Sequence, residues 1–205
     1  MIQLAEKGVV VTERQAQALK YFQKEFIEVN GDSTLFANTF REGDTIRYPA
    51  LAKTLRNISE NGRAGFYTGE TAQKLAAFIQ EKGGMVTEED LEKYEAVWRQ
   101  PIIFDYRGIR IISMSPPSSG GVTMEQILKM MEPFDVSELG HNTEKYMQLF
   151  TEAAKRAYAD RNYFLGDPDF VTIPLDVMLS KAYLAQRMEN FTFDRATPES
   201  EISHG

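Results

Sequence analysis

Apolar residues recur at helical spacing through the first part of the chain, and polar residues mark the helix starts. Thr12 followed by Gln15 has the form of a capping box, which predicts a helix that ends at Gly31. Pro49 suits a first helical position, and the turn-forming stretch 61–65 ends the second helix. The expected buried face of this second helix consists of Leu51, Leu55 and Ile58.

Two further helices complete the stretch 1–97. One ends at the glycine pair that begins with Gly83. Thr87 and Asp90 form a second capping-box pattern, in which aspartate replaces the more usual glutamate or glutamine, and they predict a short helix. The expected core positions of these two helices are Leu75, Phe78, Ile79, Leu91 and Tyr94.

The period of the pattern changes to that of strands in residues 98–114. Two runs rich in β-branched residues, 102–104 and 109–113, flank a turn with Asp105 first and Gly108 fourth, as type I turns favour. A hairpin is therefore predicted. Because a single hairpin is marginal in water, we expect its strands to extend a sheet whose other strands lie outside this chain.

Residues 115–190 return to a helical pattern. Prolines at 116 and 117 end the strand, and the clearest helix spans 142–166. Pro174 is expected to start one last helix. The expected core residues of the three helices are Ile127, Leu128, Met131, Tyr146, Leu149, Phe150, Ala153, Ala157, Phe164, Leu175, Met178, Leu179 and Tyr183. Residues 191–205 are polar and without periodicity, which predicts a loop or linker.

The predicted fold class is therefore α+β, a predominantly helical piece with one β-hairpin, with residues 1–205 as a single unit. Composition agrees with a folded protein, since 42% of the 205 residues are hydrophobic and 26% are charged. The net charge of −7 and the lack of any Lys/Arg cluster argue against nucleic acid as a partner. No apolar stretch is long enough for a membrane span, and the opening stretch is not the apolar core of a signal peptide, because Glu6 and Lys7 interrupt it.

The chain contains no cysteine and only two histidines, His141 and His204. The lack of cysteine excludes disulfides, thiolate metal sites and a cysteine nucleophile. With only two histidines, a Ser-His-Asp triad or a histidine-rich metal site is not favoured. His141 follows a glycine in a predicted loop, and we interpret it as a polar loop residue.

The stretch "SPPSSGG" (115–121) invites two catalytic interpretations that its spacing does not favour. A phosphate loop needs a lysine directly after its glycines, whereas Lys129 lies two turns into the helix. A serine nucleophile on a sharp turn needs glycines on both sides. We expect Ser118 or Ser119 to cap the helix, and Gly120 and Gly121 to permit close approach. An anion held by N–H groups at the helix start remains an alternative.

Three carboxylates fall close together in the sequence. Asp167 and Asp169 flank a proline, which favours a turn in which aspartate side chains bond their own backbone. Asp160 lies near the apolar stripe beside Arg161, which predicts a partly buried ion pair or a cap on a neighbouring loop. Acid/base chemistry by Asp160, Asp167 or Asp169 is the catalytic alternative.

Three stretches also carry a family resemblance: "SPPSSGG" (115–121), "YADRNYFLGDPDF" (158–170) and "SEISHG" (200–205). With several other segments in matching order, they resemble the γ-glutamyltranspeptidases, or glutathione hydrolases, of the N-terminal-nucleophile superfamily. The resemblance covers essentially the whole chain. One departure is Ser115, which stands where the family usually has the first of three prolines.

The resemblance implies an αββα sandwich enzyme, made as a precursor that cuts itself into a large and a small chain. A threonine at the new end of the small chain would attack γ-glutamyl amides, with its own α-amine as the base and with no metal or organic cofactor. The implied partners are the small catalytic subunit and glutathione or other γ-glutamyl compounds. The implied location of the parent protein is periplasmic or extracellular.

Within that family, residues 1–205 would form the middle-to-C-terminal part of the large subunit, with 191–205 leading toward the self-cleavage site. None of the family's catalytic, substrate-binding or metal residues falls on this chain, so we expect the isolated piece to be inactive and to self-associate. Residues expected near the site as a structural motif are Ser118, Ser119, Gly120, Gly121, Asp160 and Arg161. The alternative is a stand-alone helical binding module.

Overall fold

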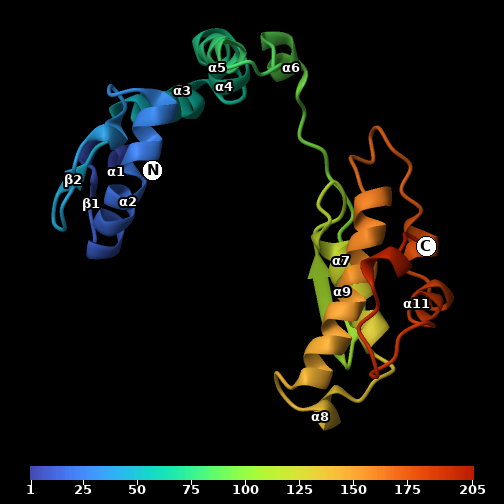
Figure 1. Cartoon of the computed structure of the whole chain (residues 1–205). Coiled ribbons are helices and arrows are strands. Elements are labelled where there is room, and N and C mark those ends of the chain that lie inside the picture. Colours follow the sequence, from blue (N-terminus) through green and yellow to red (C-terminus); the bar gives the residue numbers. More distant parts are fainter. The chain divides into compact units, whose positions relative to one another are not determined.

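The computed structural model describes all 205 residues, and their contacts divide the chain into two compact units (Figure 1). The first unit comprises Met1–Ala96 and the second comprises Val97–Gly205. The fold is α+β and mostly helical, as the sequence predicted. None of its helices combines the length and the apolar character that a membrane-spanning helix needs. That residues 1–205 act as one piece of a larger fold stays a prediction.

The first unit is a chain of helices with one small two-stranded ladder. Its elements are α1 (Ile2–Lys7), β1 (Val9–Val10), α2 (Glu13–Asn30), η1 (Leu35–Ala37), β2 (Thr45–Ile46), α3 (Pro49–Asn61), α4 (Ala64–Tyr67), α5 (Gly69–Glu81) and α6 (Glu88–Lys93). Both predicted capping boxes, at Thr12 and Thr87, are present with their reciprocal hydrogen bonds. The antiparallel pair β1–β2 was not predicted, because strands of two residues are too short to show alternation.

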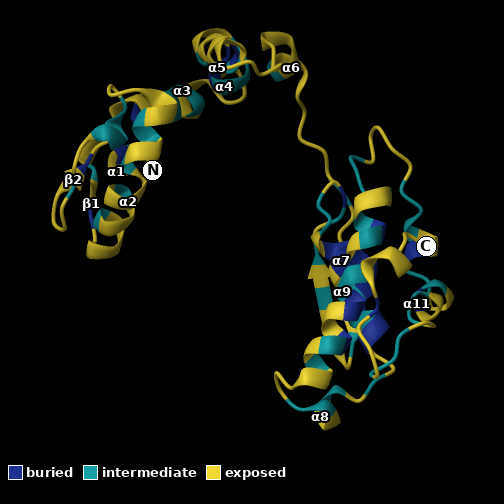
Figure 2. Ribbon diagram, in the orientation of Figure 1, coloured by how far each residue is buried: buried dark blue, intermediate teal, exposed yellow.

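Small residues, rather than the predicted large ones, fill the interior of this unit. Its buried apolar side chains are Ala5, Val11, Ile46, Ala52, Ala72 and Ala76. The predicted core residues Leu51 and Phe78 are exposed, and α2 has no buried residue. The other predicted residues of α3 and α5, which are Leu55, Ile58, Leu75 and Ile79, are half-buried, so the prediction is wrong only for Leu51 and Phe78. Most of this unit has the colours of exposed and intermediate residues (Figure 2).

The second unit packs helices on a hairpin. Its elements are β3 (Ile102–Tyr106), β4 (Ile109–Ser113), α7 (Gly120–Met131), α8 (Val136–Leu139), α9 (Glu144–Phe164), α10 (Leu175–Met178), α11 (Lys181–Arg187) and η2 (Glu199–Glu201). The predicted hairpin is confirmed, but its turn is not type I. The strands continue to Tyr106, and Arg107 and Gly108 alone form the turn with φ of 50° and 81°. Two positive φ angles define a type I′ turn, whose twist matches that of the strands.

The helix α7 lies between the hairpin and α9 in this unit. A Cβ on Gly121 would come within 2.4 Å of the Met114 carbonyl oxygen, so only glycine allows the start of α7 to approach the strand end this closely. Because α7 has neighbours on two sides, its buried stripe includes Val122, Gln126 and Met130 as well as the predicted Met131. The buried core cluster of the unit is Met130, Met131, Leu149, Ala153, Ala157 and Leu184.

Two predictions for the end of the chain are corrected by the structure. The single helix expected from Pro174 is two helices, because the Ser180 side chain accepts a hydrogen bond from the Tyr183 N–H and starts α11 anew. Residues 191–205 are largely irregular, as expected, but they are not detached. Phe191 and Phe193 pack edge-on against Phe134, with ring centroids 5.5 and 6.1 Å away. The tail is therefore part of the second unit.

Candidate functional site

A row of buried charged side chains along α9 is the most unusual feature of the second unit. Glu152, Arg156 and Asp160 are four residues apart and are 2%, 1% and 0% exposed. They share the buried side of α9 with Leu149, Ala153 and Ala157. Asp160 was predicted from the sequence as a buried charged residue, whereas Glu152 and Arg156 were not. Their i, i+4 spacing beside the apolar stripe was the available signal.

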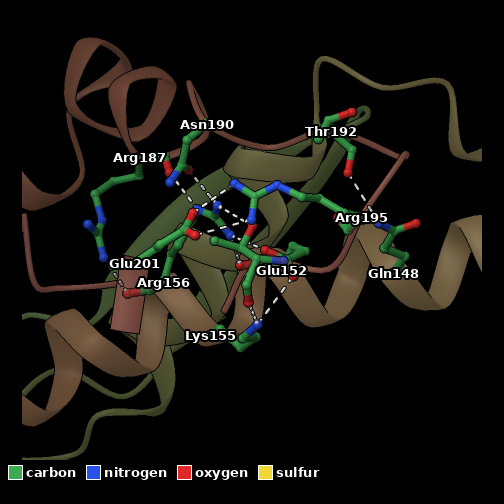
Figure 3. Close-up of polar contacts among 10 residues, drawn as sticks. Gln148, Glu152, Lys155, Arg156, Arg187, Asn190, Thr192, Arg195 and Glu201 are labelled. Carbon is green, nitrogen blue, oxygen red and sulfur yellow. Dashed lines mark hydrogen bonds and ion pairs between the residues drawn. The ribbon is translucent and has the colours of Figure 1, made fainter. Parts of the chain in front are cut away.

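Glu152 is held as a carboxylate by three neighbouring groups (Figure 3). Its Oε2 accepts from Arg156 Nη1 at 2.6 Å, and its Oε1 accepts from the Thr197 backbone N–H at 3.0 Å. Lys155 Nζ lies 3.3 Å from Oε1. Burial by itself would raise the pKa of Glu152, but the hydrogen bonds from Arg156 and Thr197 outweigh burial and lower that pKa to about 2.

All five N–H donors of the Arg156 guanidinium have acceptors. Nη1 donates to the carboxylate and to the carbonyl oxygen of Glu152, and Nε donates to the Arg187 carbonyl oxygen at 2.6 Å. Nη2 donates to Asn190 Oδ1 at 2.6 Å and to Thr197 Oγ1 at 3.3 Å. A guanidinium whose donors are all satisfied can be buried without a large net penalty, provided that its partners stay in place.

The Asp160 carboxylate bonds to four groups, which come from α7, from α11 and from the tail. Its Oδ1 pairs with Arg187 Nη2 at 3.0 Å and accepts from the Gly205 N–H at 3.1 Å. Its Oδ2 accepts from Gln126 Nε2 at 3.0 Å and from the Tyr183 hydroxyl at 2.9 Å. Burial, together with the bond to Asp160, raises the pKa of Tyr183 to about 12. The predicted buried ion pair is confirmed, and its partner is Arg187 of α11.

The serines and glycines of "SPPSSGG" lie where α7 begins. Ser119 is the residue before the helix, but its side chain makes no capping bond, so that prediction is wrong for Ser119. Its Oγ instead accepts from Arg161 Nε at 3.0 Å, which ties α7 to α9. Ser118 Oγ accepts from the Gly120 N–H at 3.4 Å. Of the six motif residues, the structure brings Ser119 and Arg161 together, whereas Asp160 bonds a different set of groups.

The remaining candidates take structural roles. Asp167 Oδ1 accepts from the Asp169 N–H at 3.0 Å, which confirms the predicted aspartate turn, and Arg99 Nη2 lies 2.6 Å from Asp169. No group of three or more histidine, aspartate or glutamate side chains is placed to hold a metal ion. His141 is exposed beside Asn142, and neither it nor the other histidine contacts a serine or threonine hydroxyl.

The ring of His204 stacks on the ring of Tyr163. The two ring centroids are 3.5 Å apart and the ring planes differ by 3°. This contact lies next to the Gly205 N–H bond to Asp160. The described side chains therefore form no nucleophile–base pair. They form a buried polar network that holds the C-terminal tail on α9.

Known proteins of one family match this chain along its whole length. The model of the γ-glutamyltranspeptidase family matches residues 1–205. The glutathione hydrolase proenzyme of Escherichia coli K12 is 41% identical over 206 residues, a match that covers 98% of this chain and 36% of that protein. The corresponding proenzyme of Bacillus subtilis 168 is 35% identical over 196 residues, covering 95% and 33%. The chain thus spans about a third of the length of these relatives.

Solved structures give the same result for the fold. The crystal structure of Helicobacter pylori γ-glutamyltranspeptidase matches with a TM-score of 0.89 and 40% identity, covering 100% of this chain and 60% of that chain. The cephalosporin acylase from Bacillus halodurans matches with a TM-score of 0.80 and 28% identity, covering 93% and 37%.

Proposed function

The chain belongs to the γ-glutamyltranspeptidase family, and from this premise we propose that it is the middle-to-C-terminal part of the large subunit of a glutathione hydrolase. The observation that carries the proposal is the family match over all 205 residues, together with relatives that are named proenzymes and are about three times as long. The parent protein would act on γ-glutamyl amides such as glutathione.

In the proposed reaction, this chain supplies structure and its partner supplies the nucleophile. A threonine hydroxyl at the start of the small subunit attacks the γ-glutamyl carbonyl carbon, and the threonine α-amine takes the hydroxyl proton and passes it to the leaving amine. The γ-glutamyl ester that results is cleaved by water or by an acceptor amine. We also propose that the parent is periplasmic or extracellular, as the family resemblance implies.

Exposed apolar side chains support the proposal that this piece is completed by other chain segments. Ile103 and Ile112 face each other across the hairpin and are 52% and 66% exposed. In the first unit, Tyr21 is 76% exposed on α2. Uncovered apolar surface of this kind is typical of regions that pack against a partner.

The test begins with the coding region on both sides of this segment. A downstream reading frame with a candidate threonine supports the enzyme, whereas start and stop codons at these ends support a stand-alone binding module. The complete precursor should then cut itself in two and release a chromogenic anilide from its γ-glutamyl derivative. Replacement of the candidate threonine by alanine is the control and should abolish both events. Release by the 205-residue chain alone would contradict the proposal.

A further inference from the structure

One side of α9 binds the main chain of the C-terminal tail over three turns. Gln148 Nε2 donates to the carbonyl oxygens of Thr192 and Arg195 at 3.1 and 3.0 Å. Lys155 Nζ donates to the carbonyl oxygen of Thr197. The tail-binding side chains are Gln148, Glu152, Lys155 and Asp160, and these four are called the tail clasp below.

The hydrogen bonds from the tail clasp to the tail go to backbone atoms, so they do not depend on the identity of the tail side chains. Its partners on the tail are the carbonyl oxygens of Thr192, Arg195 and Thr197 and the N–H groups of Thr197 and Gly205. The thirteen residues from Gln148 to Asp160 extend about 18 Å along the helix axis. Side chains of one helix thus take the place of the neighbouring strand that would satisfy these backbone groups in a sheet.

Because the contacts of the tail with α9 are buried, they fix the tail at one position along the helix. Thr197 is 3% exposed, and its N–H and carbonyl oxygen are both bound. At the C-terminal end of the tail clasp, Asp160 accepts the Gly205 N–H and is also held by hydrogen bonds from α7 and α11. A carboxylate with all its neighbours fixed cannot follow a displaced tail without losing other bonds, so the tail has one favoured path.

We propose that the tail clasp consists of positioning residues for cleavage of the precursor. By fixing residues 192–205 on α9, the tail clasp would set the point and the direction in which the chain leaves Gly205 toward the proposed cleavage site. This inference rests on the proposed function. It concerns residues that do not touch the reacting atoms, and it assigns a role in maturation to a helix face that carries no catalytic group.

The cleavage itself balances without any group from this chain. The threonine hydroxyl attacks the carbonyl carbon of the preceding residue, the peptide C–N bond breaks, and the hydroxyl proton ends on the freed α-amine. Water then hydrolyses the ester, which restores the hydroxyl and leaves a carboxylate on the large subunit. The first step requires the hydroxyl close to one carbonyl carbon, so its rate depends on how the chain is held.

The decisive variant weakens the tail clasp without stranding a buried charge. Gln148→Ala with Lys155→Met removes three bonds to tail carbonyl groups and the Lys155–Glu152 ion pair, and it leaves the buried Glu152–Arg156 pair intact. The matched control in the first unit is Gln17→Ala with Lys53→Met, which removes an exposed bond to Glu13 and an exposed ion pair. Both double variants are made in the complete precursor.

Cleavage into two chains is followed on a gel over time, with the thermal midpoint measured in parallel. The tail-clasp variant should cleave about tenfold to a hundredfold more slowly than wild type, because small misplacements have effects of this size. The control should cleave at the wild-type rate. Lys155→Arg keeps the donor and should restore most of the rate in the presence of wild-type Gln148. A purely structural role would lower the thermal midpoint and leave the cleavage rate of folded precursor unchanged.

Hydrogen exchange on the 205-residue chain separates failure of this inference from failure of the proposed function. The Thr197 amide should be protected in wild type and exchange faster in Gln148→Ala/Lys155→Met, while the Ala153 amide inside α9 stays unchanged. A loosened tail with wild-type cleavage would overturn the positioning role, and so would an unprotected Thr197 amide in wild type. A protected tail in a precursor that never cleaves would overturn the proposed function instead.

Discussion

The two compact units begin their long helices with the same signals but have very different interiors. In Met1–Ala96 the buried apolar residues are four alanines, one valine and one isoleucine. In Val97–Gly205 the core contains large residues such as Met130 and Leu149, together with buried charges on α9. The first unit therefore gains little from burial and depends on local helix signals, whereas the second depends on packing and on its polar network.

Ion pairs show the same difference. The Lys53–Glu70 pair of the first unit has side chains that are 74% and 59% exposed, and such pairs contribute at most about 1 kcal/mol. The Arg156–Glu152 pair of the second unit has side chains that are 2% and 3% exposed. A buried pair of this kind adds little net stability, but losing one partner strands the other charge. The second unit should therefore be sensitive to single substitutions at places where the first is tolerant.

The largest expected effect comes from Arg156→Met. This change leaves the Glu152 carboxylate buried without its main partner, and we expect the second unit to lose about 3–5 kcal/mol of unfolding free energy. Urea denaturation followed by circular dichroism measures the loss. The matched control is Lys74→Met, which removes an exposed partner of Glu70 in the first unit and should change stability by less than about 0.5 kcal/mol. Equal effects of the two variants would contradict the comparison.

A pair of leucine substitutions probes the two interiors directly. Leu149→Ala removes a fully buried side chain from the core of the second unit and should cost about 2–5 kcal/mol. Leu51→Ala removes a half-exposed side chain from α3 and should cost less than about 1 kcal/mol in the chain by itself. Hydrogen exchange read out unit by unit assigns each loss. A large loss for Leu51→Ala would show that the first unit has more of a core than its burial pattern indicates.

The sequence predicted features that depend on residues close along the chain. The capping boxes at Thr12 and Thr87 join residues three apart, and the hairpin joins two apolar runs on either side of a short turn. Its register was wrong, because the predicted turn 105–108 would pair Phe104 with Ile109, whereas Tyr106 pairs with Ile109. The predicted faces of α3 and α5 are correct for the half-buried Leu55, Ile58, Leu75 and Ile79 and wrong for the exposed Leu51 and Phe78. Apolar size alone does not decide which residues are most buried, because alanines are the fully buried residues of these two helices.

The buried polar network could be predicted only in part, because its contacts are far apart in the sequence. Asp160 was recognised from its position near the apolar stripe, but its bonds reach Gln126, Arg187 and Gly205. Glu152 meets the Thr197 N–H across 45 positions, and no local pattern in 191–205 marks that contact. The tail shows no periodicity because it is bound through its backbone, which leaves no trace in side-chain type.

Acid should weaken the second unit more than the first. Because the pKa of Glu152 falls from 4.5 to about 2 on folding, the carboxylate stabilises the folded unit fully above about pH 4.5. That contribution, on the order of 3 kcal/mol, is lost as the pH falls from about 4.5 through about 2. Exchange of the Thr197 amide at a series of pH values, corrected for intrinsic rates, measures the loss. In Glu152→Gln this pH dependence should be absent; its persistence would assign it to another carboxyl group.

The smallest expected effect compares the two long helices through their caps. Thr12 and Thr143 each accept a hydrogen bond from a backbone N–H three residues later, so replacing either by alanine should cost about 1 kcal/mol locally. The outcome for helix content should nevertheless differ. Since α2 has no buried residue, Thr12→Ala should lower the ellipticity at 222 nm, whereas α9 is held by its core and by the tail. Equal loss of helix in both variants would mean that packing protects α9 no better than local signals protect α2.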